Sequence, residues 1–300
     1  MRFLITGATG LIGKKITSLI LKRGDQISAL TTNKHNINKY DNIDFFYWNP
    51  ALGIVDEDCM KGVEVVINLA GSPIAQLWTK NAKNSILKSR VNSVKLLENL
   101  ILKNRNIRNF TCASAIGIYP SNLQIEYTES SLHVSKSFLG NVVRLWEKSC
   151  HNLENNNINV LKLRIGLVLS SEGGLFKPIS FFTKYYLGTW FGKGDNFYSW
   201  IHIDDIVNSI IFLIDNNKKG IYNLVAPNPV TSKSFVTQIA KAYKTKIFFP
   251  NIPVGIVKSL FKDMSELFIF NQKVSCNKLM SDGYKFQYSD LKKALINLIK

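Results

Sequence analysis

Short apolar runs alternate with amphipathic runs along the first two-thirds of the chain. The run at 2–6 has the apolar centre Phe-Leu-Ile and predicts a buried strand, whereas 13–24 spaces its apolar residues as a helix that Gly24 closes. Because the two patterns keep alternating, the sequence predicts βαβ units and a parallel sheet. Further strands are expected at 25–31, 63–71, 108–117 and 157–170, and further helices at 92–104 and 138–153.

The largely apolar character of 63–71 is typical of a central strand covered on both faces. We therefore expect the α/β class, with a doubly wound parallel sheet and right-handed crossovers. The amino-acid composition changes after about residue 170. Residues 172–200 are rich in glycines and aromatic residues, and this segment should contribute to a cleft. The expected division is a main domain at 1–225 and a smaller C-terminal lobe at 226–300.

The charge is strongly basic, with 38 lysines and arginines against 21 aspartates and glutamates and a formal net charge of +17. The lysines are scattered singly rather than gathered in a dense tract, so we expect no nucleic-acid partner. A basic field of this size would instead raise the local concentration of a small anionic ligand.

The chain has no run of about 18 apolar residues, and its first residues lack the pattern of a secretory signal. Neither membrane insertion nor export is therefore expected. The four cysteines, Cys59, Cys112, Cys150 and Cys276, form no C-x-x-C pair. This usage favours a reducing cytoplasm over a disulfide framework or a zinc site, so we expect a cytoplasmic protein without a bound metal.

The stretch T-G-A-T-G-L-I-G at 6–13 places three glycines between the first strand and the first helix. Gly7 permits a tight turn, Gly10 lets the backbone approach a pyrophosphate, and Gly13 lets the helix pack closely on the sheet. The helix N-terminus favours an anion there, so we expect a bound dinucleotide; an ordinary glycine turn is the alternative. The expected contacts in this loop are Gly7, Thr9, Gly10, Leu11, Ile12 and Gly13.

The end of the second strand determines which dinucleotide is preferred, because an acidic residue about 20 residues past the last glycine binds the ribose 2′-OH of NAD. This chain has Thr31, Thr32, Asn33 and Lys34 there, and no carboxylate. Lys34 could face a 2′-phosphate. Thr32 and Lys34 are therefore expected contacts that favour NADP(H), with NAD(H) possible. The alternative is that Lys34 is a solvated loop lysine.

Three motifs together, TGATGLIG, VINLAG and SWIHIDDIV, resemble the short-chain dehydrogenase/reductase superfamily in its extended, epimerase-like form. The resemblance implies a Rossmann-like sheet with a smaller C-terminal substrate lobe. It also implies that NLAG at 68–71 lies along the cofactor, with Ala70 and Gly71 allowing close approach.

The segments SAIGIYP, FLGNVVRLWEKSC and LRIGLVLSSEGGLF narrow the resemblance to an atypical subgroup. Its members are labelled NAD(P)-dependent epimerase-family proteins, and their activity is unproven. They carry a short C-terminal domain of unknown function, which the tail at about 248–296 resembles. The resemblance therefore covers nearly the whole chain.

The superfamily's catalytic Tyr-x-x-x-Lys pair does not appear in this sequence between Tyr119 and Trp146. The helix expected at 138–153 has apolar residues at the corresponding places, and Ala115 stands where the family's serine or threonine is expected. The subgroup is similar in lacking these residues. Tyr119 and the neighbouring Ser114 are the remaining candidates for proton transfer; for Tyr119 the alternative is packing against the cofactor.

Lys136 is a further plausible polar group for the site. Five more polar residues are candidates, and each has a structural alternative that we favour. Glu129 is expected to be a solvated loop carboxylate, Glu147 a member of a structural ion pair, and His202 a buried structural histidine. Asp204 and Asp205 precede an apolar helical run and are expected to cap it.

Arg90 and Arg164 are left open, since either an anion or a buried ion pair would account for each. The favoured function is an atypical oxidoreductase or epimerase that acts on an unidentified small molecule. The alternative is a nucleotide-binding regulatory or scaffold protein without turnover. Either a monomer or a homodimer is compatible with the sequence.

Overall fold

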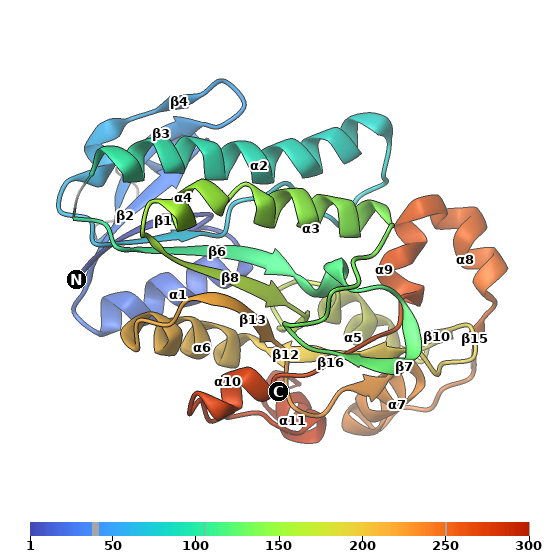
Figure 1. Ribbon diagram of the computed structural model, residues 1–300. Helices are drawn as coiled ribbons and strands as arrows, with labels where there is room; N and C mark the ends of the chain where they lie inside the picture. Colours follow the sequence, from blue (N-terminus) through green and yellow to red (C-terminus); the bar gives the residue numbers. More distant parts are fainter. Residues whose placement is uncertain (38–41, 105, 250, 300) are drawn as a thin grey trace.

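A large, mainly parallel sheet forms the centre of the computed structural model, which describes residues 1–37, 42–104, 106–249 and 251–299 (Figure 1). Within these residues the sheet has eight strands in the order β13-β8-β6-β5-β1-β2-β3-β4. Neighbouring strands are parallel, except that β4 runs antiparallel to β3. The strands are β1 (Arg2–Thr6), β2 (Gln26–Thr31), β3 (Asp44–Asn49), β4 (Ile54–Val55), β5 (Val65–Asn68), β6 (Asn109–Ala115), β8 (Asn159–Ile165) and β13 (Gly220–Leu224).

The apolar strands are buried on both faces. In β1, Phe3 and Ile5 belong to the core on one side of the sheet, while Leu4 between them belongs to the core on the other. The neighbouring strand β5 alternates in the same way, with Ile67 on the first side and Val66 on the second. This confirms the expected α/β class and the doubly wound parallel sheet.

Helices cover both faces of the sheet (Figure 1). Ile16 and Ile206 anchor the two helices of the first face, and Leu97 and Trp146 anchor two helices of the second. The first face carries α1 (Leu11–Lys22) and α6 (Ile203–Asp215); the second carries α2 (Lys80–Lys103), α3 (Phe138–Lys148) and α4 (His151–Asn155).

Three expected elements differ from those observed by more than a few residues at their ends. Helix α2 begins before residue 92, because Thr79 Oγ1 accepts from the backbone N–H of Ala82 and caps an earlier start. The single helix expected at 138–153 is wrong: it is α3 and α4, separated at a turn where the Ser149 hydroxyl donates to the Trp146 carbonyl.

The single strand expected at 157–170 is also wrong. It divides at Gly166 into β8, in the main sheet, and β9 (Leu167–Leu169), which pairs with β12 (Trp200–His202). The chain changes partner there, since Gly166 N–H donates to Leu224 and Leu167 N–H donates to Ser199. A Cβ at Gly166 would lie 2.4 Å from the Ser199 carbonyl oxygen, so the crossing needs glycine.

A third core lies below the carboxyl end of the main sheet, around Phe176, Trp200, Phe235 and Leu295. Its helices are α5 (Phe176–Lys184), α7 (Ser232–Tyr243) and α11 (Leu291–Leu298). The short elements nearby are β7 (Asn122–Tyr127), β10 (Trp190–Phe191), β11 (Phe197–Tyr198), β14 (Val230–Thr231), β15 (Asn251–Ile252), α8 (Val254–Phe261), α9 (Glu266–Ile269), β16 (Gln272–Val274) and α10 (Asn277–Ser281).

The last fifty residues return to the main body at several places. Strand β16 pairs in parallel with β7, and the Asp205 carboxylate of α6 accepts from the Tyr284 hydroxyl and from the backbone N–H groups of Gln287 and Tyr288. The division at 225/226 remains a prediction. Among the described helices, none is long and apolar enough to cross a membrane.

Candidate functional site

The glycine loop joins β1 to α1, and close backbone contacts leave no room for a side chain at Gly7 or Gly13. Gly7 has φ +72°, a left-handed conformation that favours glycine, and a Cβ there would lie 3.0 Å from the Leu69 carbonyl group. A Cβ at Gly13 would lie 2.0 Å from the Gly7 oxygen. Helix α1 therefore begins directly against the loop.

The N-terminus of α1 is free to bind an anion. Its N-cap, Gly10, provides no side-chain hydrogen bond, and the first turn contains no acidic residue. The first N–H groups of a helix have no partner within the helix and carry its positive dipole end. This end of α1 is therefore suited to a phosphate group.

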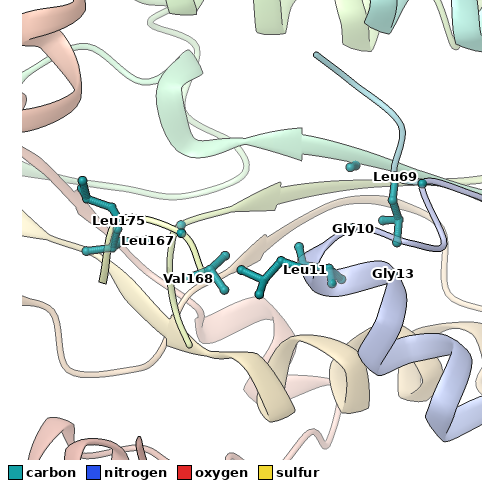
Figure 2. A pocket seen from close by; sticks show the side chains of 12 residues that line it. Gly10, Leu11, Gly13, Leu69, Leu167, Val168 and Leu175 are labelled. Carbon is teal, nitrogen blue, oxygen red and sulfur yellow. The ribbon is translucent and has the colours of Figure 1, made fainter. Parts of the chain in front are cut away.

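Two cavities meet at the glycine loop, since Gly7, Gly10 and Leu69 line both. The larger, of about 860 Å³, extends toward the ends of β2 and β3 and is also lined by Thr9, Thr31, Thr32, Trp48, Ala70, Gly71 and Lys88, among others. The smaller, of about 350 Å³, continues past Leu11, Ile12 and Gly13 to Gly166, Val168, Gly174 and Leu175. Figure 2 shows the smaller cavity, where Leu11 at the start of α1 faces Val168.

The structure brings together nine of the ten residues expected to contact a dinucleotide, all except Lys34. The Lys34 ammonium lies 5.0 Å from the centre of the Tyr47 ring, outside the lining of either cavity. Residues that the sequence reading missed are Trp48 on β3 and a polar face of α2 formed by Asn81, Asn84, Ser85, Lys88 and Asn92. Their helical spacing is visible in the sequence, but the expected helix began too late to include most of them.

A third cavity, of about 440 Å³, adjoins the smaller glycine-loop cavity and shares Gly166, Leu167, Gly174 and Leu175 with it. We call it the apolar cavity. Most of its wall is aliphatic or aromatic, from Ile74, Ile116, Leu139, Val142, Trp146, Pro178, Phe197, Leu267 and Phe270. Two charged side chains, Arg90 and Glu266, also line it.

Glu266 is the acidic member of this lining. Its Oε2 is buried without a hydrogen-bond partner among the described residues. Burial raises the pKa of the Glu266 carboxyl, and the Ser137 hydroxyl opposes that effect. The sequence contains no local signal for this residue, because α9 and the apolar wall meet only in the folded chain.

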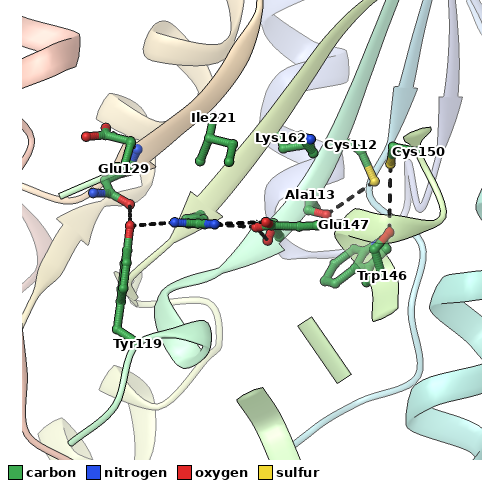
Figure 3. Close-up of polar contacts among 12 residues, drawn as sticks. Cys112, Ala113, Tyr119, Glu129, Trp146, Glu147, Cys150, Lys162 and Ile221 are labelled. Carbon is green, nitrogen blue, oxygen red and sulfur yellow. Dashed lines mark hydrogen bonds and ion pairs between the residues drawn. The ribbon is translucent and has the colours of Figure 1, made fainter. Parts of the chain in front are cut away.

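The two candidate proton donors lie beside the apolar cavity but do not line it. Ser114 donates to Glu147 Oε1 at 2.6 Å, and the Tyr119 hydroxyl donates to Asn223 Oδ1 at 2.7 Å. Arg164 connects them: its Nη1 donates to the Tyr119 hydroxyl, while its Nε and Nη2 each lie 2.9 Å from a different oxygen of Glu147. Figure 3 shows this chain of contacts from Tyr119 to Glu147.

The side chains in this network are buried, and burying a polar or charged group without a partner is costly, so they pair with one another. Burial raises the pKa of the Tyr119 hydroxyl, opposed by Arg164. Glu147 is in the structural ion pair that we expected, and for Arg164 the ion pair is the correct alternative. Glu129 is a partly exposed loop carboxylate that also accepts from the backbone N–H of Asn223 at 2.8 Å.

His202 is fully buried, as expected, and it caps α6: its Nδ1 accepts from the backbone N–H of Asp204 at 3.1 Å. The expected capping role of Asp204 and Asp205 is therefore wrong. Asp205 instead holds the segment at 284–288, and Asp204 forms an ion pair with Lys15. The histidine takes the cap because it lies one residue before the helix.

Two family models match the chain. Residues 3–224 match the NAD dependent epimerase/dehydratase family, and residues 252–298 match a domain of unknown function, DUF1731. The epimerase family protein SA0724 of Staphylococcus aureus (strain N315) is 34% identical over 303 residues, which cover 100% of this chain and 99% of that protein. Epimerase family protein YfhF of Bacillus subtilis (strain 168) is 32% identical and is covered to 98%.

Solved structures are similar over the same length. The structure of human epimerase family protein SDR39U1 (isoform 2) with NADPH superposes with a TM-score of 0.87 at 24% identity and 99% coverage of both chains. A nucleoside-diphosphate sugar epimerase from Corynebacterium glutamicum gives a TM-score of 0.78 at 25% identity, covering 100% of this chain and 58% of that one. The likeness to the human protein shows a shared fold.

Proposed function

Since the chain belongs to the NAD dependent epimerase/dehydratase family, we propose that it is an oxidoreductase or epimerase that uses NADP(H) or NAD(H). The observation that carries this proposal is that the smaller glycine-loop cavity adjoins the apolar cavity. The two cavities share four lining residues, Gly166, Leu167, Gly174 and Leu175. A cofactor ring in the first cavity would be open to a small molecule in the second.

The residues present fit a dinucleotide. The uncapped N-terminus of α1 and the Gly7–Gly10 turn would hold the pyrophosphate, where Gly7 and Gly13 leave no room for a side chain. The larger cavity would take the adenosine half, and the smaller the nicotinamide half. When bound, the nicotinamide supplies a hydride donor or acceptor.

NADP(H) is the favoured form because β2 ends at Thr31 and is followed by Thr32, without a carboxylate. Lys34 follows closely and is exposed beside Tyr47, where its long side chain can turn toward a 2′-phosphate. Lys88 provides a cation within the lining of the larger cavity itself.

Proton transfer is assigned to Glu266. Glu266 lines the apolar cavity, and its raised pKa lets the carboxyl hold a proton nearer neutral pH. Tyr119 and Ser114 are secondary candidates, because both hydroxyls are engaged with Asn223 and Glu147. Because these hydrogen bonds occupy both hydroxyls, they favour the second candidate function, which is nucleotide binding without turnover.

Titration with NADPH and NADH, followed by fluorescence, tests the proposal. We expect micromolar binding, tighter for NADPH, that is lost in Gly10→Val and retained in Gly255→Val, which lies in α8 with open space around it. Glu266→Gln should bind NADPH normally and lose turnover in a screen of carbonyl substrates. If neither cofactor binds the wild-type protein, the proposal fails; binding without turnover by any variant or substrate favours the second function.

A further inference from the structure

Arg90 is a buried cation in the wall of the apolar cavity. Its side chain comes from the middle of α2 and is only 7% exposed. Its Nη1 donates to the carbonyl oxygens of Ser72 at 3.2 Å and Ile86 at 2.9 Å. The guanidinium carbon lies 5.0 Å from the centre of the Trp146 ring. The side chain is therefore held in place from several sides.

The guanidinium has no counterion within the described residues. No carboxylate forms an ion pair with it there, and Nε and Nη2 have no hydrogen-bond acceptor. Arg90 lines the apolar cavity, and Nε and Nη2 are the guanidinium atoms left without an acceptor there. Burial lowers the pKa of Arg90 to about 10, as expected for a cation without a compensating negative charge.

Arg164 shows what the same edge of a guanidinium binds elsewhere in this protein. Its Nε and Nη2 each donate to one oxygen of the Glu147 carboxylate at 2.9 Å. This planar, two-point contact is the geometry in which arginine recognises carboxylates. The same two nitrogens of Arg90, Nε and Nη2, have no carboxylate partner among the described residues.

We propose that the apolar cavity binds a substrate that carries one carboxylate, which pairs with Nε and Nη2 of Arg90 while an apolar or ring-containing body packs on the aliphatic wall. The inference rests on the proposed function for the identity of this cavity as the substrate site. With Glu266 holding its proton as proposed above, a single carboxylate matches the charge of Arg90; a phosphate dianion would leave a net negative charge in an apolar surrounding.

The cofactor is not the partner of this edge. Arg90 lines neither glycine-loop cavity, and the anion site for the pyrophosphate is at the N-terminus of α1. Gly71, which lines the larger glycine-loop cavity, lies against the guanidinium: a Cβ there would lie 3.0 Å from the guanidinium carbon of Arg90. The absence of a side chain at 71 is thus required by Arg90 as well as by any approach of a cofactor.

Calorimetric titration of the NADPH-loaded protein with benzoate and with its neutral isostere benzamide tests the inference. Benzoate should bind at least about ten-fold more tightly than benzamide, the difference expected for a charge-assisted pair. Arg90→Met should abolish that preference, Arg90→Lys should retain part of it, and Arg144→Met on the exposed face of α3 should leave it unchanged.

NADPH affinity and the thermal midpoint of each variant separate the outcomes. Arg90→Met with normal NADPH binding and no preference for benzoate supports the inference. Equal affinities for the two probes, no binding of either, or a preference that persists in Arg90→Met overturns it while the cofactor site stands. Competition between benzoate and NADPH also overturns it, because Arg90 would then serve the cofactor. Failure of the wild-type protein to bind NADPH instead overturns the proposed function.

Discussion

Single residues in this protein take their roles from the partner that the fold brings to them. Arg90 and Arg164 have the same side chain and are similarly buried, yet Arg164 meets Glu147 and Arg90 meets only carbonyl groups and an indole among the described residues. The first is consequently a structural ion pair, and the second is available to a ligand.

His202 provides a pH-dependent contribution to stability. Its Nδ1 must be unprotonated to accept from Asp204 N–H, and burial lowers the pKa of the imidazole, opposed by Asp204 and Asp205. The unfolded chain, with a histidine pKa of about 6.5, takes up the proton first. The free energy of unfolding should therefore hold above about pH 6.5 and fall as the pH drops below it toward the folded value.

Urea unfolding between about pH 8 and pH 5 measures this slope. His202→Asn retains a side-chain oxygen that can cap α6 and cannot titrate, so its slope over that range should be flatter. His133→Asn, in an exposed loop, is the control and should keep the wild-type slope. An unchanged slope in His202→Asn would assign the acid sensitivity to other groups.

At the scale of elements, the loop between β1 and α1 is defined by contact between backbones. Gly13 lies where α1 touches the Gly7 carbonyl and Ala8, so the helix axis and the loop cannot move apart or closer independently. Close packing of helix on strand is what directs the α1 N-terminus into the two cavities.

Gly13→Ala should therefore destabilise the protein by about 1–3 kcal/mol and weaken NADPH binding, because a Cβ would lie 2.0 Å from the Gly7 oxygen and 2.8 Å from Ala8. Gly255→Ala, within α8 and with nothing near the added methyl group, should be neutral or slightly stabilising. Chemical denaturation and NADPH titration provide the two readouts. Wild-type stability in Gly13→Ala would show that α1 can shift without cost.

At the scale of the whole molecule, the C-terminal segment is part of the wall of the apolar cavity rather than an appendage. Glu266, Leu267, Phe270 and Gln272 line that cavity together with residues of α2, α3 and β9. The same segment is fastened at its far end by Asp205, which is fully buried beneath Tyr284 and Tyr288.

Asp205→Ala removes the acceptor of three hydrogen bonds and leaves the N–H groups of Gln287 and Tyr288 without their partner. Leaving a buried donor such as Tyr288 N–H unpaired costs about 1–3 kcal/mol, so this segment should open at lower denaturant concentration. Limited proteolysis should then cut between residues 253 and 298 before the main sheet is attacked. Asp204→Ala, at the adjacent and more exposed position, should retain the wild-type pattern; equal protection of both variants would contradict the anchoring role.

The sequence by itself determined the features that depend on residues close together in the chain. The alternating apolar and amphipathic runs specified the order of strands and helices, and the three glycines marked the turn from β1 into α1. Each of these follows from local periodicity or backbone conformation. Where the chain changes partner, as at Gly166, the local pattern continued smoothly and the expectation was wrong.

Only the tertiary structure decided which polar side chains are paired and which are free. Arg164 and Glu147 lie 17 residues apart, and Arg90 reaches the wall that Glu266 completes from the other end of the chain. The physical reason is that the free energy of a buried charge depends on the groups packed around it, and packing joins segments that are distant in sequence. The position of the glycine loop was therefore visible in the sequence, whereas the chemistry of the cavity beside it required the folded chain.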